Sequence, residues 1–265
     1  MFKDLFAFLD QWKAEGDEQT IPASVKEVLD NINKFAFHRL LNEILKKSGI
    51  NLDATCRPNE YLTVISALLS RGGLNYAELP KGLLHFHEYS NGSRTSFEEH
   101  LVEGAQYCKT KNGKVSVHFT VTPEHQPLFE NLLIKVRHHY ESAYQVTFDV
   151  TFSAQSSSTD TLAVDLQNNP FRNQDGSLLF RPGGHGALIH NLDHLRQEII
   201  FIKNIDNVVP DYLKAKTIRY KKILAGLVLS LREKVYHFLN ALDSGKPDHK
   251  LIDVIIAFYC KDFFL

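Results

Sequence analysis

The chain has 265 residues, of which 43% are hydrophobic, and its 30 basic and 31 acidic side chains nearly cancel. This length and composition allow one large buried core or two small ones. The balanced charge argues against bulk nucleic-acid binding, which needs a basic surface. Cys56, Cys108 and Cys260 are far apart and form no Cys-x-x-Cys pair, so neither a disulfide framework nor a zinc knuckle is expected. With no apolar run near the roughly 20 residues that span a bilayer and no secretory signal, we expect a cytoplasmic protein with no membrane partner.

The first 70 residues are predicted to be helical. Apolar residues recur there at steps of three and four, in runs that begin at Phe2, Phe35 and Tyr61. Two glycines at 72–73 end this helical block. Ser96 with its following glutamates then predicts a helix that runs to about residue 108.

From residue 114 the period of the pattern changes. Residues 114–122 and 144–153 alternate like strands, and between them Pro123 is expected in the first turn of a helix. Farther along, a helix over about 186–196 is expected to precede a fully buried strand at Ile199–Ile202. Strand–helix–strand alternation predicts an α/β protein with a three-layer αβα arrangement and a mostly parallel sheet.

Beyond Pro210 the pattern is helical, with apolar-periodic runs over 221–242 and 251–258. The predicted organisation is therefore an α/β domain over residues 1–212 and a helical C-terminal segment over residues 213–265.

The glycine-rich stretch from Phe180 to Leu192 reads FRPGGHGALIHNL. Its glycines expose backbone N–H groups before an expected helix N-terminus, an arrangement that favours an anion. Arg181 could add a bidentate contact to a phosphate and His185 a hydrogen bond. The alternative is a turn without a ligand.

Three further polar positions could take part in binding. Asp206, flanked by Asn204 and Asn207, follows the expected strand at 199–202, where a carboxylate could bind Mg²⁺; the alternative is an Asx turn. Lys81 stands between a proline and a glycine and could contact phosphate; the alternative is a solvated loop lysine. Gln155 ends a strand and could bind a base or sugar by hydrogen bonds; the alternative is a polar loop.

Two longer segments carry a family resemblance. They read STDTLAVDLQNNPFRNQDGSLLFRPGGHGALIHNL and IIFIKNIDNVVPD, and the shorter strings LPKGLLHFHEY and RTSFEEHLVEGAQY add to them. With these segments the chain resembles a bacterial family, the domain of unknown function numbered 4301. That family is more distantly similar to nucleotide-sugar pyrophosphorylases, which have a glycosyltransferase-A-like, Rossmann-like α/β fold.

The resemblance to pyrophosphorylases assigns roles to individual residues. The loop formed by Pro182, Gly183, Gly184, His185 and Gly186 matches one that lies against the nucleotide. Asp206 with Asn207 matches an element whose aspartate lies near the metal and the sugar phosphate. Lys81 is similar to a lysine that meets phosphate, and Gln155 to a glutamine at the end of a central strand.

The resemblance implies a nucleotide-diphospho-sugar-transferase-like fold, a Mg²⁺ cofactor on Asp206, and catalytic roles for Asp206 and Lys81. The implied activity joins a nucleoside triphosphate to a sugar phosphate and releases pyrophosphate. A non-catalytic module that binds a nucleotide or nucleotide-sugar is the alternative, and a glycosyltransferase a third possibility. Because pyrophosphorylases begin with a strand and a glycine-rich triphosphate loop that this sequence lacks, the chain is expected to be truncated at its N-terminus, and its C-terminus could be shortened as well.

Overall fold

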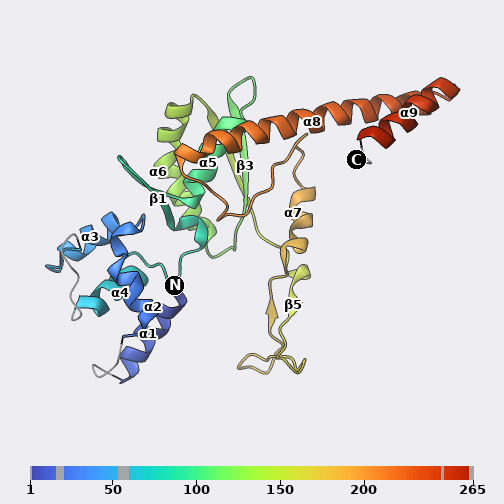
Figure 1. The fold of residues 1–265 in the computed structure, drawn as a ribbon. Coiled ribbons are helices and arrows are strands. Elements are labelled where there is room, and N and C mark those ends of the chain that lie inside the picture. The colour runs from blue at the N-terminus through green and yellow to red at the C-terminus, as the bar shows by residue number, and fades with distance from the viewer. Residues whose placement is uncertain (1, 16–20, 53–59, 246–247, 263–265) are drawn as a thin grey trace. The chain divides into compact units, whose positions relative to one another are not determined.

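The computed structural model describes residues 2–15, 21–52, 60–245 and 248–262 (Figure 1). The chain divides into two compact units, Met1–Asp211 and Tyr212–Leu265. Cys108 and Cys260 form no disulfide within the described residues, whereas Cys56 lies outside them. Within the described ranges, no helix is both long enough and apolar enough to cross a membrane.

The first unit begins with a helical part, as the sequence predicts. Its helices are α1 (Phe2–Glu15), α2 (Ala23–Asp30), α3 (His38–Lys46) and α4 (Tyr61–Leu69). Each helix has an apolar stripe that must be buried against a neighbour. The stripes meet in one core, whose most buried members are Leu5, Val25, Leu41, Val64 and Ile65.

A second core lies in the α/β part of the same unit. Its elements are β1 (His85–Tyr89), β2 (Gly92–Thr95), α5 (Ser96–Tyr107), β3 (Lys114–Thr120), α6 (Gln126–Tyr144) and β4 (Thr147–Ser153). β1 and β2 form an antiparallel hairpin, and β3 and β4 form a parallel pair joined through α6. α5 and α6 pack beside this pair (Figure 1). The core is rich in phenylalanine, including Phe97, Phe119, Phe129 and Phe148.

The start of α5 confirms a local prediction. Thr95 Oγ1 accepts a hydrogen bond from the backbone N–H of Glu98, and the Glu98 carboxylate accepts one from the backbone N–H of Thr95 at 2.8 Å. This capping box satisfies two backbone donors that a helix N-terminus leaves unpaired. The helix therefore begins at Ser96 and ends one residue before Cys108.

The sheets differ from the prediction. In the described residues, strands pair in three sheets of two strands each, and only β3–β4 is parallel. The third sheet joins β5 (Thr161–Leu162) and β6 (Phe180–Arg181). The three-layer arrangement around a mostly parallel sheet is therefore not clearly present, and the structure supports a mixed α/β protein that is mostly helical.

Three predicted elements are wrong or displaced. Ile199–Ile202 forms no strand, and the side chain of Ile202 is 70% exposed. The helix expected over 186–196 is a 3₁₀ turn at 185–188 followed by the five-residue α7 (Ile189–Asp193). Pro123 precedes α6, whose first turn contains Pro127 instead. Apolar content alone predicted regular structure in these segments, but their actual form, ends and partners depend on distant contacts.

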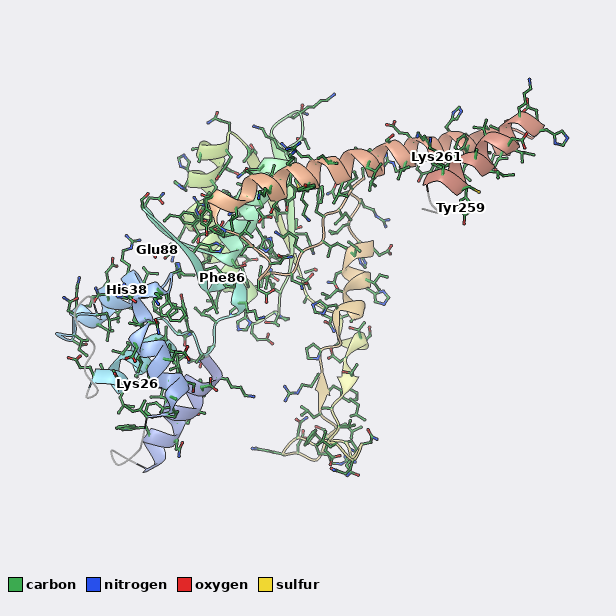
Figure 2. The ribbon with its side chains drawn as sticks, viewed as in Figure 1. Lys26, His38, Phe86, Glu88, Tyr259 and Lys261 are labelled. Atoms are coloured by element: carbon green, nitrogen blue, oxygen red, sulfur yellow. The ribbon has the colours of Figure 1, made fainter. Side chains whose placement is uncertain are left out.

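The second unit consists of α8 (Asp211–Asp243) and α9 (His249–Asp262). Both helices were predicted, and both are longer than their apolar-periodic runs. They are joined by an edge-on contact between Phe238 and Phe258, whose ring centroids lie 5.2 Å apart. Figure 2 labels Tyr259 and Lys261 on α9. Many apolar side chains of α8 are exposed, so this unit has little core of its own.

Candidate functional site

Two residues singled out from the sequence, Lys81 and Asp206, lie in direct contact. Lys81 Nζ donates a hydrogen bond to Asp206 Oδ2 at 2.7 Å, although the residues are 125 positions apart in sequence. Their side chains are 66% and 43% exposed, so both groups remain accessible to a ligand. The ammonium group of Lys81 holds the pKa of the Asp206 carboxyl below its ordinary value, through the hydrogen bond first and charge attraction second.

Glycine at position 82 allows this contact. A Cβ atom at Gly82 would lie 2.7 Å from Cε1 of the buried Phe129 ring and 3.2 Å from Cγ1 of Ile205. The backbone next to Lys81 therefore packs directly against the residue that precedes Asp206. Tertiary packing of the neighbours, rather than the exposed ion pair itself, brings Lys81 and Asp206 together.

A turn carries Asp206, and the carboxylate of Asp206 pairs mainly with Lys81. The backbone N–H of Asn207 donates to the carbonyl of Asn204 at 3.0 Å, which closes a turn with Asp206 near its apex. The main partner of the Asp206 carboxylate is Lys81. The turn that the alternative expected is therefore present, and the ion pair with Lys81 is an additional contact of its carboxylate.

The glycine loop meets a second group of predicted residues. Gln155 Nε2 donates to Thr159 Oγ1 at 3.0 Å. A Cβ atom at Gly183 would lie 2.5 Å from the Thr159 carbonyl oxygen and 3.5 Å from Gln155 Nε2. Gln155, which follows β4, and Gly183, which follows β6 of the antiparallel β5–β6 pair, are thus brought together beyond the carboxyl end of β4.

The other glycine-loop residues are less constrained. Added Cβ atoms at Gly184 and Gly186 would meet nothing within 4 Å. The side chains of Arg181 and His185 are exposed and have no side-chain partner among the described residues. The following α7 has only five residues, so the expected contribution of a helix dipole to anion binding is not supported. The backbone of the loop and Arg181 remain the groups available to an anion.

The two groups of residues are separate in the contacts described. Lys81 and Asp206 belong to one group, and Gln155 and Gly183 to the other; no hydrogen bond or ion pair among the described residues joins them. Both groups lie near the carboxyl ends of the parallel strands β3 and β4. His100, which contacts the carbonyl of Ile205, packs against the Phe119 ring near the end of β3, and Gln155 follows β4.

The Asp206 carboxylate is not part of a ready-made metal site in the part of the chain that the structure describes. Among the described residues, no group of three or more His, Cys, Asp or Glu side chains could hold a metal ion. His85 and His87, which share one strand, instead bond to Ser93 and Glu99, each at 2.9 Å. With Asp206 as its protein ligand, Mg²⁺ would need water molecules and substrate phosphates to complete its coordination.

Sequence reasoning missed the side chains that hold the Asp206 segment. Ser96 Oγ and His100 Nε2, both on α5, donate to the carbonyl oxygen of Ile205, the second at 3.1 Å. Glu103, one turn farther along α5, accepts from Lys203 Nζ at 2.6 Å. The polar residues of α5 at these spacings were a visible signal, but surface helices carry the same pattern.

Three partly buried histidines near these elements predict a pH dependence of stability. Burial is the main cause that lowers the pKa of His85, His100 and His118 below the ordinary value. Because folding favours their neutral forms, the stability they contribute is present above the unfolded pKa of about 6.5 and is lost as the pH falls through the lower folded values. We expect the midpoint temperature of thermal unfolding to decrease as the pH is lowered from 7 to 5. His100→Gln should weaken this dependence, and an identical slope in the variant would contradict the role of His100.

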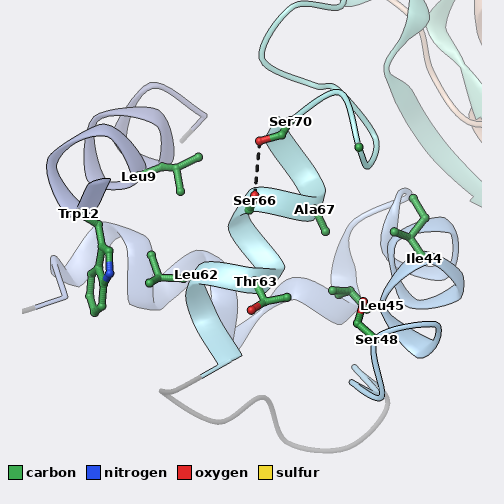
Figure 3. A pocket seen from close by; sticks show the side chains of 11 residues that line it. Leu9, Trp12, Ile44, Leu45, Ser48, Leu62, Thr63, Ser66, Ala67 and Ser70 are labelled. Atoms are coloured by element: carbon green, nitrogen blue, oxygen red, sulfur yellow. Dashed lines mark hydrogen bonds between the residues drawn. The ribbon is translucent and has the colours of Figure 1, made fainter. Parts of the chain in front are cut away.

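A pocket lies in the helical part, away from these residues. It has a volume of about 490 Å³ and is lined by residues of α1, α3, α4 and the turn that follows (Figure 3). Most lining side chains are apolar, and Ser66 and Ser70 lie 3.5 Å apart at one side. None of the predicted site residues lines the pocket. The described residues of its lining include no charged side chain that would bind a phosphate.

Comparison with known proteins places the chain in a family. No curated protein and no solved structure matches it. The model of one family matches residues 1–265. The chain therefore belongs to the family described as Domain of unknown function (DUF4301).

Proposed function

We propose that this protein binds a nucleotide or nucleotide-sugar, with the phosphates at Lys81 and Asp206 and the nucleoside at the glycine loop. The observation that carries the proposal is the contact between Lys81 and Asp206 across 125 residues. An exposed ion pair of this kind adds little to stability, whereas a lysine and a carboxylate together form a site for phosphate and a cation. The motif similarity to nucleotide-sugar pyrophosphorylases supports the same choice of ligand. From the same similarity we also propose their three-layer fold for this protein.

The reaction we propose joins a nucleoside triphosphate to a sugar phosphate. An oxygen of the sugar phosphate attacks the α-phosphorus, a new phosphorus–oxygen bond forms, and the bond to the β-phosphate breaks with release of pyrophosphate. Such a transfer needs alignment and charge neutralisation more than covalent help from the protein. Lys81 would neutralise phosphate charge, since only one of its three N–H donors is used by Asp206.

Mg²⁺ is part of this proposal, and Asp206 is the residue that would hold it. When bound, the ion would neutralise phosphate charge. The backbone at Gly183–Gly186 would bind the nucleotide, with Gln155 beside it. Asn204 and Asn207 lie on either side of Asp206 and could contact a sugar hydroxyl.

Binding measurements with matched variants test this proposal. Lys81→Met and Asp206→Asn should each weaken nucleotide or nucleotide-sugar binding by roughly tenfold or more, as expected when a charge-assisted hydrogen bond to phosphate or a metal contact is lost. The control is the pair Lys114–Asp149, which has the same residue types at 2.9 Å with similar exposure. Lys114→Met and Asp149→Asn should leave binding unchanged.

The readout is isothermal titration calorimetry with a panel of nucleotides and nucleotide-sugars, with and without Mg²⁺. Equal affinities for the site variants and the control variants would contradict the proposal. Pyrophosphate release with sugar phosphates then separates the two candidate functions. Binding without release of pyrophosphate for any sugar phosphate would favour a non-catalytic binding module. The ion pair of Asp206 with Lys81 also favours that module, because the carboxylate already has a cationic partner.

A further inference from the structure

One face of α5 is polar although it is buried. Ser96, His100, Glu103 and Tyr107 follow each other at steps of four, three and four residues, which places them on the same side of the helix. The side chains of Ser96 and Glu103 are fully buried. Buried polar groups need partners, so this polar face of α5 must meet a matching surface.

The matching surface is the segment 201–206, which is extended and then turns. Phe201, Lys203 and Ile205 are partly buried, whereas the residues between them are exposed. This alternation has the period of two that an extended backbone imposes. The residues that face away from α5 are Ile202, Asn204 and Asp206.

Each inward residue meets a residue of the polar face of α5. The Phe201 ring packs on Tyr107 with centroids 5.0 Å apart. Lys203 Nζ donates to Glu103 Oε2 at 2.6 Å, and Tyr107 donates to the same oxygen at 3.3 Å. The carbonyl of Ile205 accepts hydrogen bonds from Ser96 and His100. The segment therefore runs antiparallel to α5, toward its N-terminus.

We infer that the polar face of α5 is a positioning surface, which holds the segment 201–206 in one register and thereby presents Asp206 to Lys81. A shift of the segment by one residue would turn Asp206 toward the helix and expose Lys203. A shift by two residues would separate Lys203 from Glu103 and leave a carboxylate buried without its cation. Ser96, His100, Glu103 and Lys203 are positioning residues in this view. Their effect on ligand binding rests on the proposed function, whereas their effect on the Lys81–Asp206 contact does not.

Zero-length cross-linking tests this inference without a ligand. A carbodiimide joins an amine and a carboxylate that touch, so the full chain should yield a Lys81–Asp206 cross-link and a Lys114–Asp149 cross-link, both read by mass spectrometry. His100→Phe keeps an aromatic ring beside Phe119 but removes the donor to Ile205. It should lower the Lys81–Asp206 yield several-fold and leave the Lys114–Asp149 yield unchanged.

A conservative variant separates positioning from general damage. His100→Gln retains an N–H donor and should restore most of the Lys81–Asp206 yield. A wild-type yield in His100→Phe and in Ser96→Ala would overturn the inference. If His100→Phe lowers both cross-links, it has damaged the fold, and Ser96→Ala decides the question. Failure of the proposed function would appear differently: the Lys81–Asp206 yield would change as expected while no nucleotide binds to the wild-type chain.

Discussion

Replacing Lys203 by methionine is expected to lower the free energy of unfolding by about 3 to 5 kcal/mol, the range for removing one partner of a buried ion pair. The Lys203 side chain is 9% exposed and that of Glu103 is fully buried. Oε1 of Glu103 is also buried and has no hydrogen-bond partner among the described residues. Without Lys203 the carboxylate would keep only the hydrogen bond from Tyr107. Urea unfolding followed by circular dichroism measures the loss.

A double variant separates the buried charge from the loss of packing. When Glu103→Leu is added to Lys203→Met, no buried carboxylate remains, and most of the lost stability should return, because apolar replacement of a buried pair is often neutral. The exposed lysine at position 114 provides a control, since Lys114→Met should change the free energy of unfolding by less than about 1 kcal/mol. A double variant that is as unstable as Lys203→Met would contradict the explanation.

Replacing Gly183 by alanine is expected to dislodge the glycine loop from Gln155 and Thr159. The added Cβ would lie 2.5 Å from the Thr159 carbonyl oxygen, a backbone atom that cannot rotate away as a side chain can. We expect a loss of about 1 to 3 kcal/mol, the usual cost of forcing an extra group into a packed site. If the loop binds the nucleoside as proposed, affinity should fall by roughly tenfold or more, because each 1.4 kcal/mol corresponds to a factor of ten.

Two neighbouring glycines provide matched controls for this prediction. Added Cβ atoms at Gly184 and Gly186 meet nothing within 4 Å, so alanine at either position should leave the fold intact. Hydrogen exchange of the loop amides measures the local effect, and calorimetry with the nucleotide panel measures binding. If the loop amides of Gly183→Ala exchanged at the same rate as those of Gly184→Ala, and both variants bound nucleotide with the same affinity, the close approach to Thr159 would have no consequence.

Local interactions explain why several elements could be predicted from sequence. The α5 N-terminus depends on Thr95 and Glu98, three residues apart, so its capping box is readable from a short stretch. The strands β3 and β4 show their alternating pattern within seven residues each. Apolar residues at helical spacing similarly indicated α8 and α9, although not their full lengths.

Pairing over long distances explains what the sequence alone could not predict. The apolar run at 199–202 predicted a buried strand, but a strand needs a partner, and here the chain that follows docks on α5 instead. In the sequence, Glu103 looks like an ordinary surface glutamate of a helix. Its burial is explained by the ion pair with Lys203, a hundred positions away. Long-range contacts of this kind leave no local trace, because nothing in the sequence near either residue specifies the other.

The sequence by itself determined the helical and extended character of most segments, the balanced charge and the residue types of the candidate site, because these follow from local periodicity and composition. Only the tertiary structure decided that Lys81 meets Asp206 and that Gly183 packs against Thr159. Both contacts depend on close packing between distant segments, in which Gly82 and Gly183 have no room for a side chain.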